Sequence, residues 1–151
     1  MASYRITLFA VQLPSYGGDT QYVNMHQAWD DLPQATKDRI GRLRAIHVYL
    51  SKYSPRSLGT LSEESRRNLP PPGIHPLVQT HPDNGRKALY LNPVRMEGIE
   101  GMDDPDALAL IDELMRHSTQ PRYEYRHKWK AGDWVIWDNR SVMHQANPDY
   151  D

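Results

Sequence analysis

The histidines are the residues of this sequence best suited to catalysis or metal binding, and His144 is the first candidate. The 151 residues include no cysteine, so thiolate zinc sites, disulfides and a cysteine nucleophile are excluded within them. A metal ion would have to be held by imidazole and carboxylate groups. His144 lies in a polar segment, where a histidine is often solvent-exposed, so its type and position alone favour an ordinary surface residue over a metal ligand.

His81 and Asp83 have the H-x-D spacing of a metal-binding pair. The alternative is a turn, because Pro82-Asp83-Asn84-Gly85 consists of residues that favour turns, and Asp83 can accept hydrogen bonds from the turn backbone. Turn chemistry accounts for every residue of this segment. We therefore interpret it as a hairpin turn, with His81 at the end of a strand and outside any metal site.

The other histidines are interpreted as structural or solvent-exposed. His75 precedes a proline, and His117 ends an amphipathic helix, where the helix dipole favours a cationic side chain. His26, His47 and His127 have no carboxylates at metal-ligand spacing.

The segments that must position these side chains are mainly short strands. Twelve prolines, nine tyrosines and four tryptophans favour many turns between strands. Residues 77–80 and 88–91 flank the Asn-Gly turn and predict a β-hairpin. Residues 123–127 and 134–137 flank a second turn, which predicts another antiparallel pair, with Trp134 in the core.

Three helices and one long insertion complete the expected elements. Asn24 is placed to cap a short helix over residues 25–29, and a second helix begins at Leu32-Pro33. The third opens at Asp103-Asp104-Pro105. Its apolar face consists of Leu108, Ile111, Leu114 and Met115. Residues 51–73 follow no period and end in three prolines, which predicts a surface insertion or a lid.

Strands that are mostly antiparallel, with a few covering helices, favour a sandwich or barrel. Four segments in order resemble the taurine dioxygenase (TauD/TfdA) family, and the resemblance covers nearly the whole chain. They are residues 13–20 (LPSYGGDT), 75–82 (HPLVQTHP), 85–92 (GRKALYLN) and 137–140 (WDNR) with His144 four residues on. One segment alone would be weak, but four in the same order are specific.

The resemblance implies a double-stranded β-helix, or jelly roll, which is mainly β with covering helices and here incomplete at both ends. It also implies an Fe(II)/2-oxoglutarate-dependent dioxygenase, in which an HxD pair and a distal histidine hold Fe(II). A threonine and an arginine anchor the far carboxylate of 2-oxoglutarate. Three protein ligands leave two positions for 2-oxoglutarate and one for O₂. The substrate would be a small organic acid of the sulfonate or aryloxyalkanoate type.

On this match His144 is the distal metal ligand, and the hydroxyl of Thr20 donates to the co-substrate carboxylate. Trp137 and Asn139 are candidates for lining the pocket and positioning the ligand. Two alternatives stay open: Thr20 could simply begin a strand, and Arg140 could be a substitute carboxylate anchor or an ordinary surface charge.

Two parts of the family pattern are missing from these residues. The HxD pair lies farther upstream of Thr20 than the 19 residues before it, and the anchoring arginine lies farther downstream than the seven residues after His144. We therefore expect an internal fragment of a single domain spanning residues 1–151, which binds Fe(II) weakly and has no turnover by itself. The alternative is a non-catalytic jelly-roll remnant or binding module.

Charge and hydropathy limit the partners. Lys plus Arg number 18 against 19 Asp plus Glu, so there is no electrostatic reason to expect nucleic acid or an anionic membrane surface. No apolar run approaches the roughly 20 residues that span a bilayer, and the N-terminus lacks the features of a signal peptide. We expect a cytoplasmic protein whose partners are its small organic acid substrate and O₂, and a homo-oligomer is an option that would cover exposed sheet edges.

Overall fold

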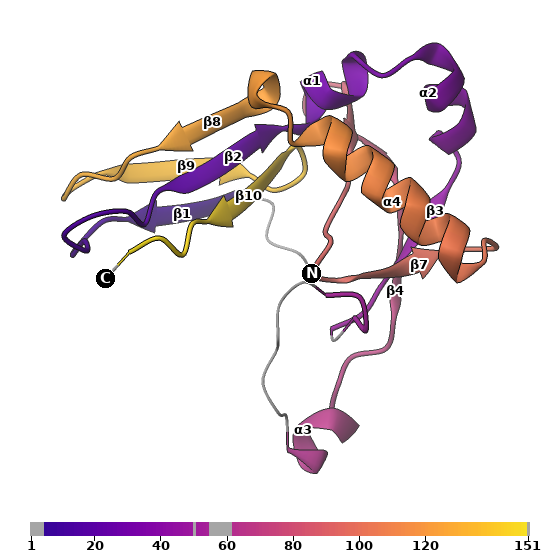
Figure 1. Cartoon of the computed structure of the whole chain (residues 1–151), viewed down its shortest axis with the longest axis horizontal. Helices are drawn as coiled ribbons and strands as arrows, with labels where there is room; N and C mark the ends of the chain where they lie inside the picture. Colours follow the sequence, from indigo (N-terminus) through magenta and orange to yellow (C-terminus); the bar gives the residue numbers. More distant parts are fainter. Residues whose placement is uncertain (1–4, 50, 55–61, 151) are drawn as a thin grey trace. The chain divides into compact units, whose positions relative to one another are not determined.

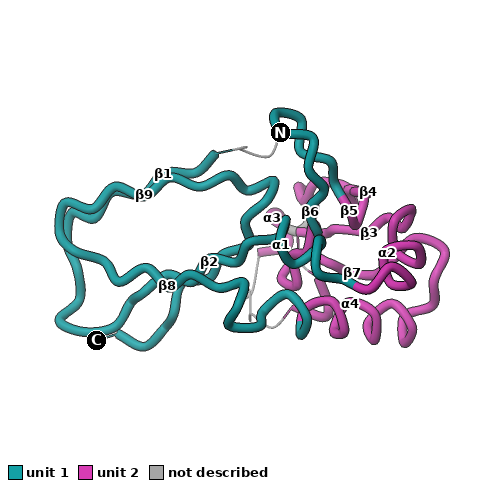
Figure 2. Tube along the Cα trace, turned by 90° about the horizontal axis from the view of Figure 1, so that it is seen from above, with its two compact units in different colours: residues 1–32, 79–89, 116–151 teal, residues 33–78, 90–115 magenta. Residues whose placement is uncertain are grey.

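The computed structural model describes residues 5–49, 51–54 and 62–150. The chain divides into two compact units and passes between them four times, as Figure 2 shows. Unit 1 comprises residues 1–32, 79–89 and 116–151, and unit 2 comprises residues 33–78 and 90–115.

The elements are short, as the sequence predicts, and Figure 1 labels most of them. The strands are β1 (Arg5–Phe9), β2 (Thr20–Asn24), β3 (Arg44–His47), β4 (Gly73–Pro76), β5 (Val78–Thr80), β6 (Lys87–Leu89), β7 (Met96–Ile99), β8 (Glu124–His127), β9 (Trp134–Asp138) and β10 (Val142–Ala146). The helices are α1 (Met25–Asp30), α2 (Gln34–Ile40), α3 (Glu63–Arg67), α4 (Asp104–Ser118) and the 3₁₀ turn η1 (Pro121–Tyr123).

Unit 1 is built around two antiparallel sheets. β1 pairs with β9, and β2 lies between β10 and β8. Side chains of the two sheets meet where the ring of Trp137 in β9 approaches that of Tyr22 in β2 edge-on, with 5.2 Å between their centroids. Both residues are buried, so this aromatic contact forms part of the core that joins the sheets.

The second antiparallel pair expected from the sequence is wrong. β8 pairs with β2 and β9 pairs with β1, so these successive strands belong to different sheets. The turn between them, where Gly132 has a φ of +88°, carries the chain from one sheet to the other. Alternating residues indicate which side of a strand is buried, but they do not identify the strand beside it. Trp134, expected in the core, is 69% exposed and donates through Nε1 to Thr7 Oγ1 on the neighbouring strand.

The β5–β6 hairpin is confirmed, but its turn is wider than a two-residue Asn-Gly turn. The amide of His81 donates to the carbonyl of Arg86 (2.8 Å), and the amide of Gly85 donates back to the carbonyl of His81 (2.8 Å). Gly85 has a φ of +70°, whereas no other residue type in the described ranges has a positive φ. Asn84 therefore does not adopt the left-handed conformation that a type I′ turn requires.

Helix α1 confirms the capping signal in the sequence. The amide of Gln27 donates to Asn24 Oδ1 at 3.1 Å, which satisfies one of the free N–H groups in the first turn. The histidines beside this helix are structural, as interpreted from the sequence: His26 is buried and donates through Nδ1 to the carbonyl of Lys87 (2.8 Å). His117 donates through Nε2 to the carbonyl of Ala28 (2.7 Å).

Unit 2 contains the three-stranded sheet β4–β3–β7 and most of α4. Ala45 in β3 faces Ile99 in β7, and both are buried. The expected long helix is confirmed, with the amide of Asp106 donating to Asp103 Oδ1 at 3.0 Å. Its buried residues are Ala107, Leu110, Ile111, Leu114 and Ser118. Among the described residues, no helix has the length and apolar character needed to cross a membrane.

The segment 51–73 is only partly described, since residues 55–61 lie outside the described ranges. Its first residue is held firmly: Ser51 is buried, and its hydroxyl donates to the carbonyl of Met96 at 2.7 Å. Lys52 forms an ion pair with Asp104 at the start of α4 (2.9 Å). A role as surface insertion or lid stays a prediction.

Candidate functional site

The residues predicted to bind metal and co-substrate lie on one face of the β10–β2–β8 sheet. The register places His144 opposite Tyr22, and Thr20 opposite Ala146. Directly opposed residues project to the same face, as do residues two apart along a strand. His144 and Thr20 are therefore diagonal neighbours on that face, at a spacing of about 7 to 8 Å between backbones.

The imidazole of His144 is exposed to solvent but bordered by two aromatic rings. The Trp137 ring centroid lies 4.8 Å away with the planes inclined at 57°, and the Tyr22 ring stacks at 6.3 Å. These contacts restrict the side-chain rotamers and so limit the directions in which the ring nitrogens can point. An exposed imidazole with a restricted orientation suits a metal ligand.

Thr20 is 5% exposed, and its hydroxyl already has one defined contact. Trp129 Nε1 donates to Thr20 Oγ1 at 3.0 Å. Because a hydroxyl both accepts and donates, accepting this bond leaves the O–H proton of Thr20 to donate to another acceptor. That arrangement suits a carboxylate anchor, although Thr20 also begins β2, so both roles suggested by the sequence are compatible.

The side chains of Trp137 and Asn139 are hydrogen-bonded to each other. Trp137 is buried, and its Nε1 donates to Asn139 Oδ1 at 2.9 Å. Since the Trp137 ring also contacts His144, Asn139 fixes a side chain that in turn borders the candidate ligand. Their assignment as pocket-lining and positioning residues stays a prediction.

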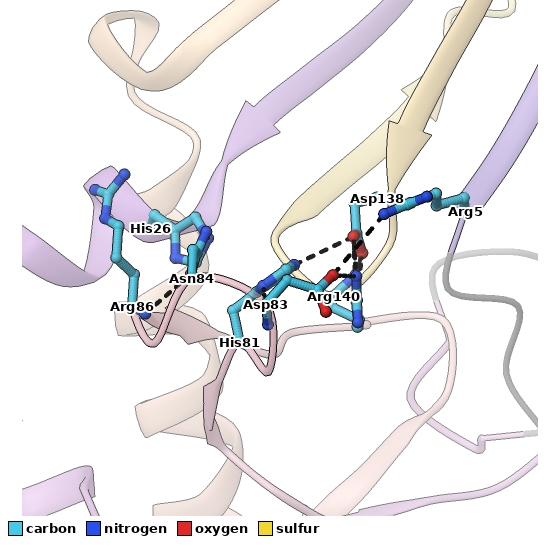
Figure 3. A network of polar contacts seen from close by, with 8 residues as sticks. All are labelled: Arg5, His26, His81, Asp83, Asn84, Arg86, Asp138 and Arg140. Carbon is cyan, nitrogen blue, oxygen red and sulfur yellow. Dashed lines mark hydrogen bonds and ion pairs between the residues drawn. The ribbon is translucent and has the colours of Figure 1, made fainter.

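A polar network that the sequence did not reveal joins the β5–β6 turn to the β9–β10 turn, as drawn in Figure 3. The amide of Asp83 donates to His81 Nδ1 at 3.2 Å, so this nitrogen is the acceptor and the proton is on Nε2. Nε2 then donates to Asp138 Oδ2 at 3.2 Å. A neutral imidazole satisfies both contacts, and neither nitrogen keeps a lone pair for a metal.

Arg140 supplies the positive charge of this network. Its Nε donates to Asp138 Oδ1 (2.8 Å), and its Nη2 donates both to Asp138 Oδ2 and to Asp83 Oδ2, the latter at 2.8 Å. Hydrogen bonds from the Arg140 guanidinium hold the pKa of the Asp138 carboxyl well below its usual range. Arg5 lies 3.8 Å from the same oxygen of Asp83.

Among the described residues, one group of three has the composition of a metal site: His81, Asp83 and Asp138, with one ligand atom from each within 4.8 Å of the others. A guanidinium already contacts both carboxylates, and the lone pair of the imidazole accepts a backbone hydrogen bond. This chemistry is that of an ion-pair network. The expected turn at this segment is confirmed. That the His81-Pro82-Asp83 segment does not bind metal stays a prediction, and these contacts support it.

The same contacts bear on the alternative role of Arg140. Its guanidinium could have anchored a co-substrate carboxylate, but it binds two carboxylates of the protein instead. The signal in the sequence was the Asp138-Asn139-Arg140 spacing, in which an arginine two residues after an aspartate folds back within one turn. The second carboxylate comes from a turn 57 residues away, which no local pattern indicates.

Comparison with known proteins supplies the wider context. The model of the family described as "Taurine catabolism dioxygenase TauD, TfdA family" matches residues 4–151. The alpha-ketoglutarate-dependent 2,4-dichlorophenoxyacetate dioxygenase of Burkholderia sp. (strain RASC) is 45% identical over 92% of this chain and 46% of its own length. The alkylsulfatase of Acinetobacter baylyi is 33% identical over 91% of this chain and 45% of its own length.

A solved structure shares the fold. That of AAD-2 in complex with Mn(II) and N-oxalylglycine is 37% identical and superposes with a TM-score of 0.87, covering 98% of this chain and 54% of AAD-2. The likeness confirms the expected fold class, a mainly β jelly roll with a few helices, of which these residues form a part. The chain spans about half the length of the relatives it matches.

Proposed function

The chain belongs to the taurine dioxygenase (TauD/TfdA) family, and from this premise we propose that the protein is an Fe(II)/2-oxoglutarate-dependent dioxygenase in which His144 is a metal ligand. The observation that carries the proposal is the shared face of His144 and Thr20. The candidate metal ligand and the hydroxyl that would donate a hydrogen bond to the co-substrate carboxylate are diagonal neighbours on this face. A 2-oxoglutarate that chelates the metal at one end and is anchored at the other requires two such groups.

The side chains around this face would have distinct tasks. Trp137 and Tyr22 hold the imidazole of His144 in place, and Asn139 holds Trp137. Trp129 orients the hydroxyl of Thr20 toward a carboxylate. When bound, Fe(II) with 2-oxoglutarate would supply the oxidative chemistry, which converts 2-oxoglutarate, O₂ and the organic substrate to succinate, CO₂ and the hydroxylated substrate.

We propose a small organic acid as the substrate, with aryloxyalkanoates as the first class to assay. The support is that a relative with 45% identity is a 2,4-dichlorophenoxyacetate dioxygenase. Sulfonates and sulfate esters form the second class, since an alkylsulfatase is also among the relatives. A cytoplasmic location and a homo-oligomeric state belong to the same proposal.

The decisive measurement is succinate release from 2-oxoglutarate with Fe(II), ascorbate, O₂ and phenoxyacetate. We expect none from the 151-residue chain, and robust release from a polypeptide extended to include an HxD pair upstream and an arginine downstream. Losing the arginine alone should weaken 2-oxoglutarate binding roughly ten- to a hundredfold, because a hydrogen bond to a charged group contributes about 1.5 to 3 kcal/mol. In the extended polypeptide, His144→Ala should abolish release.

Gln145→Ala is the matched control, since Gln145 is exposed on the same strand and projects to the opposite face of the sheet. It should retain succinate release. Robust turnover by the short chain that depends on His144 would show that other residues complete the metal site. An extended polypeptide without His144-dependent metal binding would favour the non-catalytic module instead.

A further inference from the structure

We propose that a hollow in unit 2, bordered by His47, His75, Tyr90 and Arg95, binds a small aromatic carboxylate without any metal. The hollow has a volume of about 250 Å³ and is lined entirely by residues of that unit. Its volume suits a single ring with a short acidic substituent, since pockets for drug-sized ligands start at about 300 Å³. The site uses no residue of the β10–β2–β8 face, so it does not rest on the proposed oxygenase chemistry.

The backbone of three adjacent strands fixes the positions of His47, His75 and Arg95. His47 in β3 pairs with Gly73 in β4, two residues before His75. On the other side, the amide of Val48 donates to the carbonyl of Arg95 at 2.8 Å, just before β7 begins. These three side chains therefore extend from a hydrogen-bonded sheet, which favours a preformed arrangement.

Aromatic rings form one wall. His47 and His75 meet edge to face with 5.2 Å between ring centroids, and Tyr90 lies 5.5 Å from His47 and 5.7 Å from His75. Rings that contact one another at these distances and inclinations offer both faces and edges to a further ring. An aromatic ligand would extend this cluster.

Arg95 supplies the charge. Its guanidinium stacks over the Tyr49 ring at 4.2 Å and donates from Nη1 to the carbonyl of Tyr49, which fixes the plane of the group. A guanidinium has five N–H donors in a fork that matches a carboxylate. None of the residues that line the hollow is acidic, so its net charge favours an anion.

His47 adds a polar atom that is buried behind the aromatic wall. Its Nε2 is buried and has no hydrogen-bond partner among the described residues. Burial, reinforced by the neighbouring His75, lowers the pKa of His47 to about 4, so the ring is neutral at pH 7 and can donate to an acceptor or accept from a donor.

NMR titration of the 151-residue chain, observing both ligand and protein signals, with EDTA and no 2-oxoglutarate, tests the proposal. Benzoate is the probe, benzamide is its neutral isostere, and acetate lacks the ring. We expect benzoate to bind at least tenfold more tightly than either comparison molecule, with shifts of the His47 and His75 ring resonances. Equal binding of benzoate and benzamide, or no binding of benzoate, would overturn the proposal.

Variants locate the site. Arg95→Gln should weaken benzoate binding roughly ten- to a hundredfold, the effect of removing a charge-assisted hydrogen bond. Arg42→Gln makes the same charge change at an exposed residue of unit 2 that does not line the hollow, and it should bind as the parent does. Equal weakening by both variants would show that benzoate is attracted non-specifically by positive charge, and it would overturn the proposal.

Two further variants distinguish a loss of benzoate binding from a loss of folding, and this hollow from the proposed metal site. His75→Ala removes an exposed ring from the wall, so it should weaken benzoate binding while the melting temperature stays near that of the parent. Unchanged binding by His75→Ala would contradict the aromatic wall. His144→Ala should leave benzoate binding intact, and failure of succinate release would leave the benzoate result unaffected.

Discussion

At the scale of single residues, Asp138 stands out because its charge is compensated by neighbours rather than by water. Its side chain is 21% exposed and that of Arg140 is 14% exposed, whereas Asp30 and Arg86 form an ion pair that is about half exposed on both sides. Hydrogen bonds to charged groups contribute more when both partners are shielded. The two pairs therefore offer a matched comparison within unit 1.

We predict that Asp138→Asn lowers the free energy of unfolding by roughly 1.5 to 3 kcal/mol, because Arg140 loses a charge-assisted partner. Asp30→Asn should cost less than about 1 kcal/mol, as exposed ion pairs do. Urea unfolding followed by circular dichroism measures both. Equal losses in the two variants would contradict the role assigned to the network.

The depressed pKa of Asp138 also fixes the direction of a pH effect. An unfolded aspartate has a pKa of about 3.9, so in acid the unfolded state binds a proton more readily than the folded state. The stabilisation is fully present above that pH and is lost as the pH falls toward the lower folded pKa. Unfolding curves measured from pH 7 down to pH 2.5 should decline less steeply for Asp138→Asn than for the parent below about pH 4.

The neighbouring His81-Pro82-Asp83 segment gives a prediction about metal binding. Asp83→Asn should leave Fe(II) binding unchanged under anaerobic titration calorimetry, because asparagine serves a turn as well as aspartate does. The parent chain itself should bind weakly, since a single imidazole lacks the chelation of three ligands. A large loss of affinity in Asp83→Asn would mean that the discarded pair is the true site.

The candidate site was predictable only in part. The family-like segments picked out His144 and Thr20, but the register between β2 and β10 was needed to place them on one face. Of the two rings that border His144, Trp137 lies in the preceding strand and belongs to the same family-like segment, whereas Tyr22 comes from a strand remote in sequence. Spacing along the chain carries no information on the Tyr22 contact, because it depends on which strand pairs with β10.

At the scale of elements, local signals were reliable and pairings were not. The cap at Asn24, the acidic start of α4 and the β5–β6 hairpin each depend on residues within a few positions of one another. The partners of β8 and β9 lie about a hundred residues or more upstream. The alternating pattern of β9 is compatible with pairing to β1 or to β8. The prediction took the strand nearer in sequence, β8, and was wrong.

The segment 51–73 gives a prediction at this scale. Limited proteolysis should cut first inside it, because α3 has only five residues and its described side chains are exposed. Arg67 is a trypsin target within that helix. Ser51 and Lys52 are anchored to residues 96 and 104, so the cut should fall after them. A first internal cut elsewhere would remove the lid hypothesis.

At the scale of the whole molecule, the outer face of the β1–β9 pair is unusually apolar. Phe9 is 59% exposed, Trp134 is 69% exposed and Ile136 is 61% exposed. The register places Phe9 opposite Trp134 and Thr7 opposite Ile136, so these side chains project from one side of the pair. Contiguous exposed apolar side chains mark surfaces that bind protein, in contrast to single scattered ones.

We predict that the 151-residue chain self-associates through this face. Sedimentation velocity from 5 to 200 µM should show a weight-average mass that rises with concentration, and Ile136→Lys should suppress the rise, because a lysine at the centre of the face would have to be desolvated. Tyr125→Lys is the control: Tyr125 is 61% exposed on β8, in the other sheet of unit 1. If both variants reduce association equally, added charge alone explains the effect and the face has no special role. A parent chain that stays monomeric throughout would show that these side chains tolerate water.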